Sequence, residues 1–180
     1  MRLRTGAGLL AAALAAAATA GVIPAARADP SVVPAETAAG YAQAVAEARR
    51  RAGFAFAVPT RIPRSGGPLH AYAMPLFGAG DTIVSFDHSA DCHGARYCSA
   101  GSFSVSRRPI AHERDRTGQP ITRSLADGLF FTPEHAMADS FPAQVQWQSG
   151  GLTYTMAWSQ LAPGEAPAVL GAIARTVTPP

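Results

Sequence analysis

Two residue types, lysine and asparagine, are absent from this chain of 180 residues, and all 15 of its basic residues are arginine. Without lysine, the chain can form no Schiff base and offers no lysine nucleophile. Without asparagine, it has no N-x-[Ser/Thr] acceptor for N-glycosylation. Enzyme classes that depend on a catalytic lysine are therefore excluded.

The common catalytic motifs are also missing. The sequence contains no G-x-S-x-G elbow, no H-E-x-x-H zinc motif, no G-x-x-x-x-G-K-[Ser/Thr] phosphate loop and no G-x-G-x-x-G after a strand. The segment Gly78–Asp81 is better explained as a hairpin turn than as a phosphate cradle. We therefore predict no catalytic residue and no cofactor.

Positive charge in excess of negative charge is confined to residues 1–28. These hold Arg2, Arg4 and Arg27 and no acid, which leaves 12 arginines against 12 acids in the rest of the chain. Binding to nucleic acid by counterion release needs a basic surface on the folded domain. We therefore predict no nucleic-acid partner, and we expect the arginines at 49–51 to lie in the last turn of a helix, where they complement its dipole.

Residues 1–28 have the three parts of a secretory signal peptide. Arg2 and Arg4 precede an uncharged apolar run, Gly8–Ile23, and Ala26–Ala28 fits the rule for cleavage before Asp29. The run is too short and too rich in alanine for a stable transmembrane anchor. No cysteine follows it for lipid attachment. The sequence predicts a periplasmic or extracellular (secreted) protein.

The two cysteines, Cys92 and Cys98, are separated by five residues. Outside the cytoplasm, an even pair at this spacing favours a disulfide. Closing so small a loop contributes about 2–2.5 kcal/mol to stability. We predict a structural disulfide between them.

The remaining pattern predicts a flexible start at residues 29–34 and a single α+β domain at 35–180. Good helix formers indicate a helix over 35–52, and apolar residues at helical spacing indicate a second helix over 163–177. Short apolar runs between Gly, Pro and Ser predict strands at 54–59, 68–75, 81–88, 101–109, 120–125 and 128–132. The expected fold is a mostly antiparallel β-sheet with an N-terminal helix and a C-terminal helix packed on it.

A hairpin is predicted around Gly150-Gly151, which can form a two-residue turn with positive φ. This register sorts apolar and polar residues to opposite faces, and a slip by one residue would destroy the sorting. The predicted pairs are Trp147–Tyr154, Val145–Met156 and Ala143–Trp158 on the apolar face, and Gln148–Thr153 and Gln146–Thr155 on the polar face.

This part of the chain carries a resemblance. The run W-Q-S-G-G-L-T-Y at 147–154, Leu161, Ile173-Ala174 and V-P-T-R-I-P at 58–63 resemble uncharacterised secreted or periplasmic bacterial cell-envelope domains, which end in a Trp-Gly-Tyr hairpin and an amphipathic helix. Arg175-Thr176 stands where such tails often have serine. The resemblance implies the fold and an envelope location, and it carries over no catalytic residue.

The densest group of polar side chains is the run Asp87–His93 beside the predicted disulfide. One interpretation is a plain polar loop at a sheet edge. A second gives His88 and His93 to zinc or copper, with Asp87 or Asp91 as a third ligand. A third pairs a histidine base with a serine and an acid, the serine being Ser89, Ser99 or Ser102. The plain loop is favoured, because the fixed spacing of metal ligands is absent.

Other histidines are scattered. His70 alternates with Tyr72 and Met74, as a strand histidine does, and we expect Glu134-His135 in a turn or short helix. The run 112–118 carries acids among arginines and is expected as a solvated loop.

Together these patterns predict a non-enzymatic, exported binding or envelope-associated domain whose partner is an unknown protein or small-molecule ligand in the envelope. The predicted contact surface is the loop 87–101, with the candidate binding residues His88, Asp91, His93, Arg96 and Tyr97. The alternative is a small secreted metal-dependent or hydrolytic enzyme that uses His88, Asp91 and His93. A structural envelope component without a discrete site is the third possibility.

Overall fold

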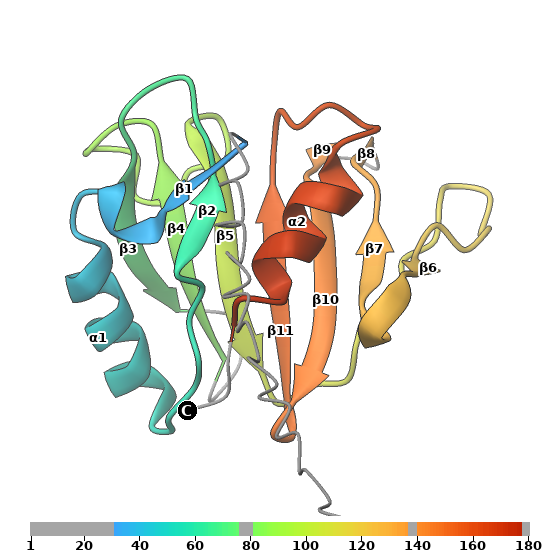
Figure 1. Ribbon diagram of the computed structural model, residues 1–180, viewed down its shortest axis with the longest axis horizontal. Helices are drawn as coiled ribbons and strands as arrows, with labels where there is room; N and C mark the ends of the chain where they lie inside the picture. Colours follow the sequence, from blue (N-terminus) through green and yellow to red (C-terminus); the bar gives the residue numbers. More distant parts are fainter. Residues whose placement is uncertain (1–30, 76–80, 137–139, 178–180) are drawn as a thin grey trace, which may run out of the picture.

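The hairpin around Gly150-Gly151 lies near the centre of the fold. The computed structural model describes residues 31–75, 81–136 and 140–177 (Figure 1). Gly150 and Gly151 have φ values of 57° and 75°, which suit a tight turn between antiparallel strands. The turn joins β10 (Ala143–Ser149) to β11 (Leu152–Trp158). All five predicted residue pairs occur in this register, so the hairpin prediction is confirmed.

In the described part of the chain, seven strands form one sheet in the order β3-β4-β5-β11-β10-β7-β6, and every neighbouring pair is antiparallel. Two small sheets, β1-β2 and β8-β9, lie beside it. The strands outside the central hairpin are β1 (Val32–Pro34), β2 (Arg61–Pro63), β3 (His70–Pro75), β4 (Thr82–Asp87), β5 (Ser99–Ser106), β6 (Arg123–Ser124), β7 (Phe130–Thr132), β8 (His135–Ala136) and β9 (Ser140–Phe141).

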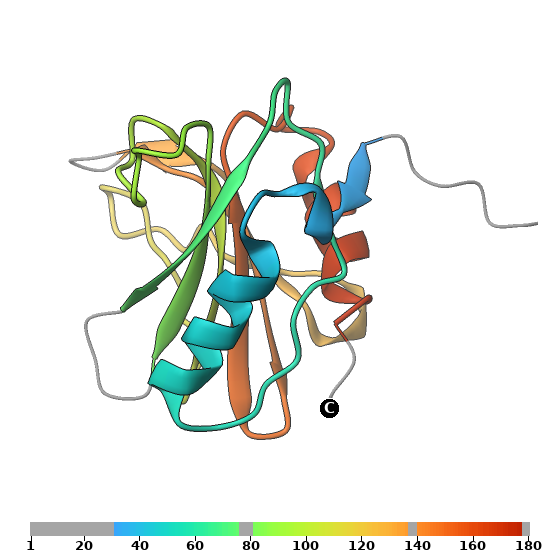
Figure 2. The ribbon, with the colours of Figure 1, turned by 90° about the vertical axis from the view of Figure 1, so that its left-hand side faces the viewer.

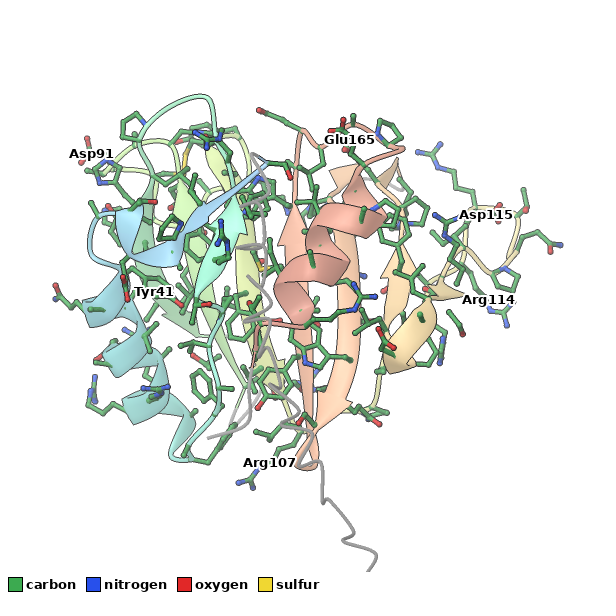
Figure 3. The ribbon with its side chains drawn as sticks, in the orientation of Figure 1. Tyr41, Asp91, Arg107, Arg114, Asp115 and Glu165 are labelled. Carbon is green, nitrogen blue, oxygen red and sulfur yellow. A yellow bond between two sulfur atoms is a disulfide. The ribbon has the colours of Figure 1, made fainter. Side chains whose placement is uncertain are left out.

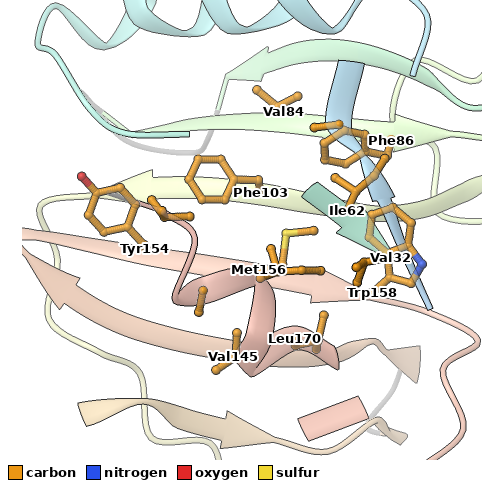
Figure 4. Close-up of a cluster of buried hydrophobic side chains, with 14 of the residues drawn as sticks. Val32, Ile62, Val84, Phe86, Phe103, Val145, Tyr154, Met156, Trp158 and Leu170 are labelled. Carbon is orange, nitrogen blue, oxygen red and sulfur yellow. The ribbon is translucent and has the colours of Figure 1, made fainter. Parts of the chain in front are cut away.

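Two helices, α1 (Tyr41–Ala52) and α2 (Ala166–Ala174), pack on the apolar face of the sheet. Tyr41 of α1 stacks on Phe86 of β4, with ring centroids 6.0 Å apart. Leu170 of α2 is fully buried in the same core (Figure 4). The predicted α+β architecture, a mostly antiparallel sheet with two helices, is therefore confirmed.

The opposite face of the sheet is polar along its central strands. Alternation along β5 puts Ser102, Ser104 and Ser106 on this face, and their half-burial shows that it is partly open. Gln146 and Thr153 also lie here, although both are buried. Figure 2 shows α2 and β1 on one side of the strands, and the 88–98 segment with the β8–β9 hairpin on the other. The sheet thus has one face in the core and one polar face.

Two predictions for the N-terminal part were wrong. The helix expected over 35–52 begins only at Tyr41, because Gly40 takes a left-handed φ of 78° and Ala39 pairs with His70 of β3. A 3-10 turn, η1 (Ala35–Thr37), precedes it. Residues 32–34, expected within a flexible start, form β1, which pairs with β2.

The segment 54–59 was expected as a strand but forms none. Phe56 and Ala57 are buried by packing instead, and the rings of Phe54 and Phe56 lie edge to face with centroids 6.0 Å apart. Arg49 at the end of α1 lies over Phe56 and donates to the Phe56 carbonyl oxygen. Apolar composition alone therefore did not distinguish a ladder strand from a packed coil.

Other predicted elements also end at different residues in the structure, and most are shorter than predicted. The strand expected over 101–109 begins at Ser99 and ends at Ser106, before Arg107-Arg108-Pro109. The strands expected at 120–125 and 128–132 shrink to β6 and β7, because the 3-10 turn η2 (Ala126–Gly128) lies between them with Asp127 at φ 61°. The second helix spans Ala166–Ala174 rather than 163–177. The turn predicted at Gly78–Asp81 falls mostly outside the described residues, which resume at Asp81.

The close contact between Gly101 and Trp158 gives a stability prediction. A Cβ atom added at Gly101 would lie 2.3 Å from Cε3 of Trp158 and 2.4 Å from the Ala157 carbonyl oxygen. We expect Gly101→Ala to lower the free energy of unfolding by about 1–3 kcal/mol, because the buried indole must move. Urea unfolding monitored by tryptophan fluorescence measures it. Gly66→Ala is the control, since its Cβ meets nothing within 4 Å. Equal unfolding free energies for the two variants would contradict the prediction.

Candidate functional site

The predicted disulfide between Cys92 and Cys98 is present, with Cα atoms 6.0 Å apart, within the ordinary range for such bonds. Cys92 is buried. The bond closes the segment that joins β4 to β5, which we call the disulfide loop (residues 87–101). Backbone hydrogen bonds inside it, from Ala95 N to Cys92 O and from Cys98 N to Ala95 O, add two short turns. The loop is therefore tied both covalently and by its own backbone.

A buried carboxylate anchors the loop to the sheet. Asp87, the last residue of β4, has no exposed surface. Its Oδ1 accepts a hydrogen bond from Ser85 Oγ at 2.6 Å, and its Oδ2 accepts one from the backbone N–H of Gly94 at 2.6 Å. Hydrogen bonds to a charged acceptor are stronger than those between neutral groups. Asp87 therefore holds the far turn of the loop against the end of β4 and is not free to serve as a metal ligand.

The turn at His93-Gly94 fits closely over β3. Both residues have positive φ, 48° and 78°, and a Cβ atom at Gly94 would overlap the sulfur of Met74 at 1.8 Å. The Tyr72 hydroxyl donates to the Ala90 carbonyl oxygen. The His93 ring lies 5.1 Å from the Tyr72 ring. Tyr72 and Met74 of β3 thus pack against the disulfide loop and help to hold it in place.

The structure gives His88 and His93 different neighbours. His88 is exposed, and its Nδ1 lies 3.5 Å from Ser65 Oγ, whereas His93 packs on Tyr72. Among the residues that the structure describes, no group of three His, Cys, Asp or Glu side chains is placed to hold one metal ion. Asp91 is exposed at the outer side of the loop (Figure 3).

The serine that the structure places within 3.5 Å of a histidine ring nitrogen is not one of those predicted. Ser99 Oγ lies 3.3 Å from Ser85 Oγ and within hydrogen-bond distance of the Phe86 and Gly101 carbonyl oxygens, to one of which it can donate. It therefore belongs to the Asp87 anchor. Ser65, which sequence reasoning did not single out, is the serine near His88.

Arg96 and Tyr97, the last two predicted residues, face outward at the end of the loop. Tyr97 is 91% exposed, the most exposed large hydrophobic side chain that the structure describes. The Arg96 guanidinium lies 5.3 Å from the centre of the Phe141 ring. On Phe141, the ring of His135 is stacked at 5.2 Å with an interplanar angle of 11°. We call Arg96, Phe141 and His135 the aromatic column.

The aromatic column joins the disulfide loop to the β8–β9 hairpin. Phe141 is 39% exposed although it contacts both neighbours. A guanidinium over the face of an aromatic ring makes a favourable cation–π contact. No local pattern predicts this contact, because Phe141 and His135 lie about 40 residues along the chain from Arg96. His135, expected in a turn or short helix, lies in β8.

The charged run at 112–118 forms an exposed loop, as predicted. Asp115 organises it by accepting hydrogen bonds from the hydroxyl and the backbone N–H of Thr117 and from the backbone N–H of Gln119. These bonds, that from the Thr117 hydroxyl first, lower the pKa of the Asp115 carboxyl. Figure 3 shows this loop on the side of the molecule away from Asp91.

No protein-family model, curated protein or solved structure matches this chain. Neither α1 nor α2, nor any other helix within the described residues, has the length and apolar character that a membrane crossing requires.

Removal of the disulfide tests its contribution. We expect the double variant Cys92→Ser/Cys98→Ser to lose about 2 kcal/mol of unfolding free energy, because the unfolded chain regains the entropy of an open loop. Denaturant unfolding of the variant and of the oxidised protein measures the loss. In the native unreduced protein, neither thiol should react with an alkylating reagent. Rapid alkylation of both thiols would contradict the bond.

The Asp87 anchor has its own test. We expect Asp87→Ala to speed amide hydrogen exchange across residues 88–98 and to cost about 1–3 kcal/mol of stability, because the Gly94 N–H loses its acceptor. Hydrogen exchange followed by mass spectrometry measures the first effect. Asp91→Ala is the matched control, since this carboxylate is exposed on the same loop. Equal exchange in the two variants would show that Asp87 is not the anchor.

Proposed function

We propose that the protein is an exported binding or envelope-associated domain that contacts its partner through the disulfide loop. Residues 1–28 act as the secretory leader, and the folded part works in the periplasm or outside the cell. The observation that carries the proposal is the 91% exposure of Tyr97 on a backbone tied by the Cys92–Cys98 bond. Large exposed aromatic side chains on ordered backbone are common anchors in protein interfaces.

Order in the free loop supports this function. A loop that is already fixed loses less conformational entropy when a partner binds, so more of the contact energy appears as affinity. The Asp87 hydrogen bonds, the disulfide and the contacts of Tyr72 all restrain the loop without covering its outer surface. His88, Asp91, His93, Arg96 and Tyr97 are all exposed there.

The aromatic column enlarges this surface beyond the loop itself. Phe141 lies under Arg96 and remains 39% exposed. Tyrosine, arginine and phenylalanine are the side chains enriched in interface cores. A partner that covers Tyr97 would therefore also meet the edge of the β8–β9 hairpin.

Site-specific photocrosslinking tests the proposal. We expect benzoylphenylalanine in place of Tyr97 to give discrete covalent adducts in the producing cells, because the proposed partner covers this position. Mass spectrometry of the purified adducts identifies the partner. The same probe at Gln119, an exposed residue on the 112–118 side of the molecule, is the control.

The yield of these adducts should fall when Arg96→Ala and Phe141→Ala are added, since these changes remove the aromatic column. Identical adduct patterns from positions 97 and 119, or none from position 97, would overturn the proposal. Stoichiometric zinc or copper that is lost in His88→Ala/His93→Ala would instead support the enzyme alternative.

A further inference from the structure

A pocket lies on the polar face of the sheet, at the end away from the disulfide loop. Its cavity measures about 260 Å³ and includes Ser106, the last residue of β5. Ser99, at the other end of β5, belongs to the disulfide loop, and the seven residue steps from Ser99 to Ser106 span about 23 Å along the strand. Asp91 and Arg107 mark these two ends in Figure 3. This sheet-face pocket is therefore separate from the surface proposed above.

A nearly buried carboxylate forms one wall of the pocket. The side chain of Asp81 is only 6% exposed, and its Oδ2 is held by Nε of Arg108 at 3.0 Å. A carboxylate has lone pairs for several donors. Asp81 thus keeps acceptor capacity at the pocket, in an orientation fixed by Arg108.

The floor of the pocket holds an amide whose hydrogen bonds are incomplete. Gln146 is 7% exposed, and its Nε2 donates to Thr155 Oγ1 at 3.2 Å. Its Oε1 is buried and has no partner in the part of the chain that the structure describes. A buried polar atom without a partner costs free energy that a ligand can recover by supplying one. Rotation of the terminal amide exchanges its oxygen and nitrogen, so it can meet a donor or an acceptor.

The rest of the pocket combines hydroxyls with a small apolar wall. Thr153 Oγ1 donates to the Arg108 carbonyl oxygen at 2.6 Å, which fixes the segment after β5 over the sheet. Pro109 and Ala111 of that segment supply the apolar contacts. The volume is below the roughly 300–1,000 Å³ of pockets for drug-sized ligands, so the occupant is small.

The charges and hydrogen-bonding groups define the occupant further. The negative charge of Asp81 and the positive charge of Arg108 cancel. The pocket therefore attracts neither an anion nor a cation by net charge. A hydroxyl group both donates and accepts, which matches a carboxylate, a guanidinium and an amide placed together. We propose that the sheet-face pocket binds one hydroxyl-rich ring of a neutral carbohydrate, with Asp81 and Gln146 as its main contacts.

Saturation-transfer NMR on the folded protein tests this proposal with glucose and N-acetylglucosamine as neutral probes, and glucosamine and glucuronic acid as their charged counterparts. At about 10 mM, each probe is in tenfold excess over a dissociation constant of 1 mM. We expect transfer to at least one neutral sugar and weaker transfer to its charged counterparts. Asp81→Asn and Gln146→Met should each weaken the binding of that sugar at least tenfold, as measured by titration.

Gln144→Leu is the matched control, because Gln144 lies on the same face of the same strand, two residues away, and does not line the pocket. Circular dichroism and the unfolding midpoint of each variant verify that it is folded. Tyr97→Ala should leave sugar binding unchanged, which separates this site from the disulfide loop. Absence of transfer to both neutral sugars, equal transfer to the charged ones, or an equal loss in folded Gln144→Leu would overturn the proposal.

Discussion

The alternation of side chains along β5, β11 and β10 is the constraint on which the rest of the structure depends. Phe103, Met156 and Val145 lie on one face of these strands and are almost fully buried under the helices. The intervening Ser, Thr and Gln residues necessarily point to the other face. A register slip of one residue would place polar groups in the core. The same constraint therefore builds the core and leaves a polar face on which small ligands can bind.

Asp87 connects this sheet to the disulfide loop. It is the last residue of β4, it points to the polar face, and its carboxylate accepts hydrogen bonds from Ser85 and from the loop at Gly94. Ser99 at the start of β5 completes the arrangement through Ser85. These hydrogen bonds fix the loop that carries Tyr97 to the end of the sheet. The disulfide adds a second restraint on the same loop.

Sequence reasoning succeeded where the signal was local. The Gly150-Gly151 turn and strict alternation on both sides determined the hairpin register, and two nearby cysteines determined the disulfide. It failed for 54–59, where an apolar run has no strand partner and packs as coil. It also missed the contact of Arg96 with Phe141 and that of His88 with Ser65, because only the tertiary fold brings these residues together. Of the candidate site, the loop and its exposed residues were predictable, whereas its anchors on β3 and β4 were not.

The position of Arg96 between the two bonded cysteines affects how the protein withstands proteases. An exposed arginine on a surface loop is a natural point of cleavage by trypsin-like enzymes. A single nick after Arg96 would leave the two halves of the chain covalently joined through Cys92 and Cys98. Each new chain end would be only a few residues from its tethered cysteine. The molecule can therefore be cut within its disulfide loop and still remain one covalent unit.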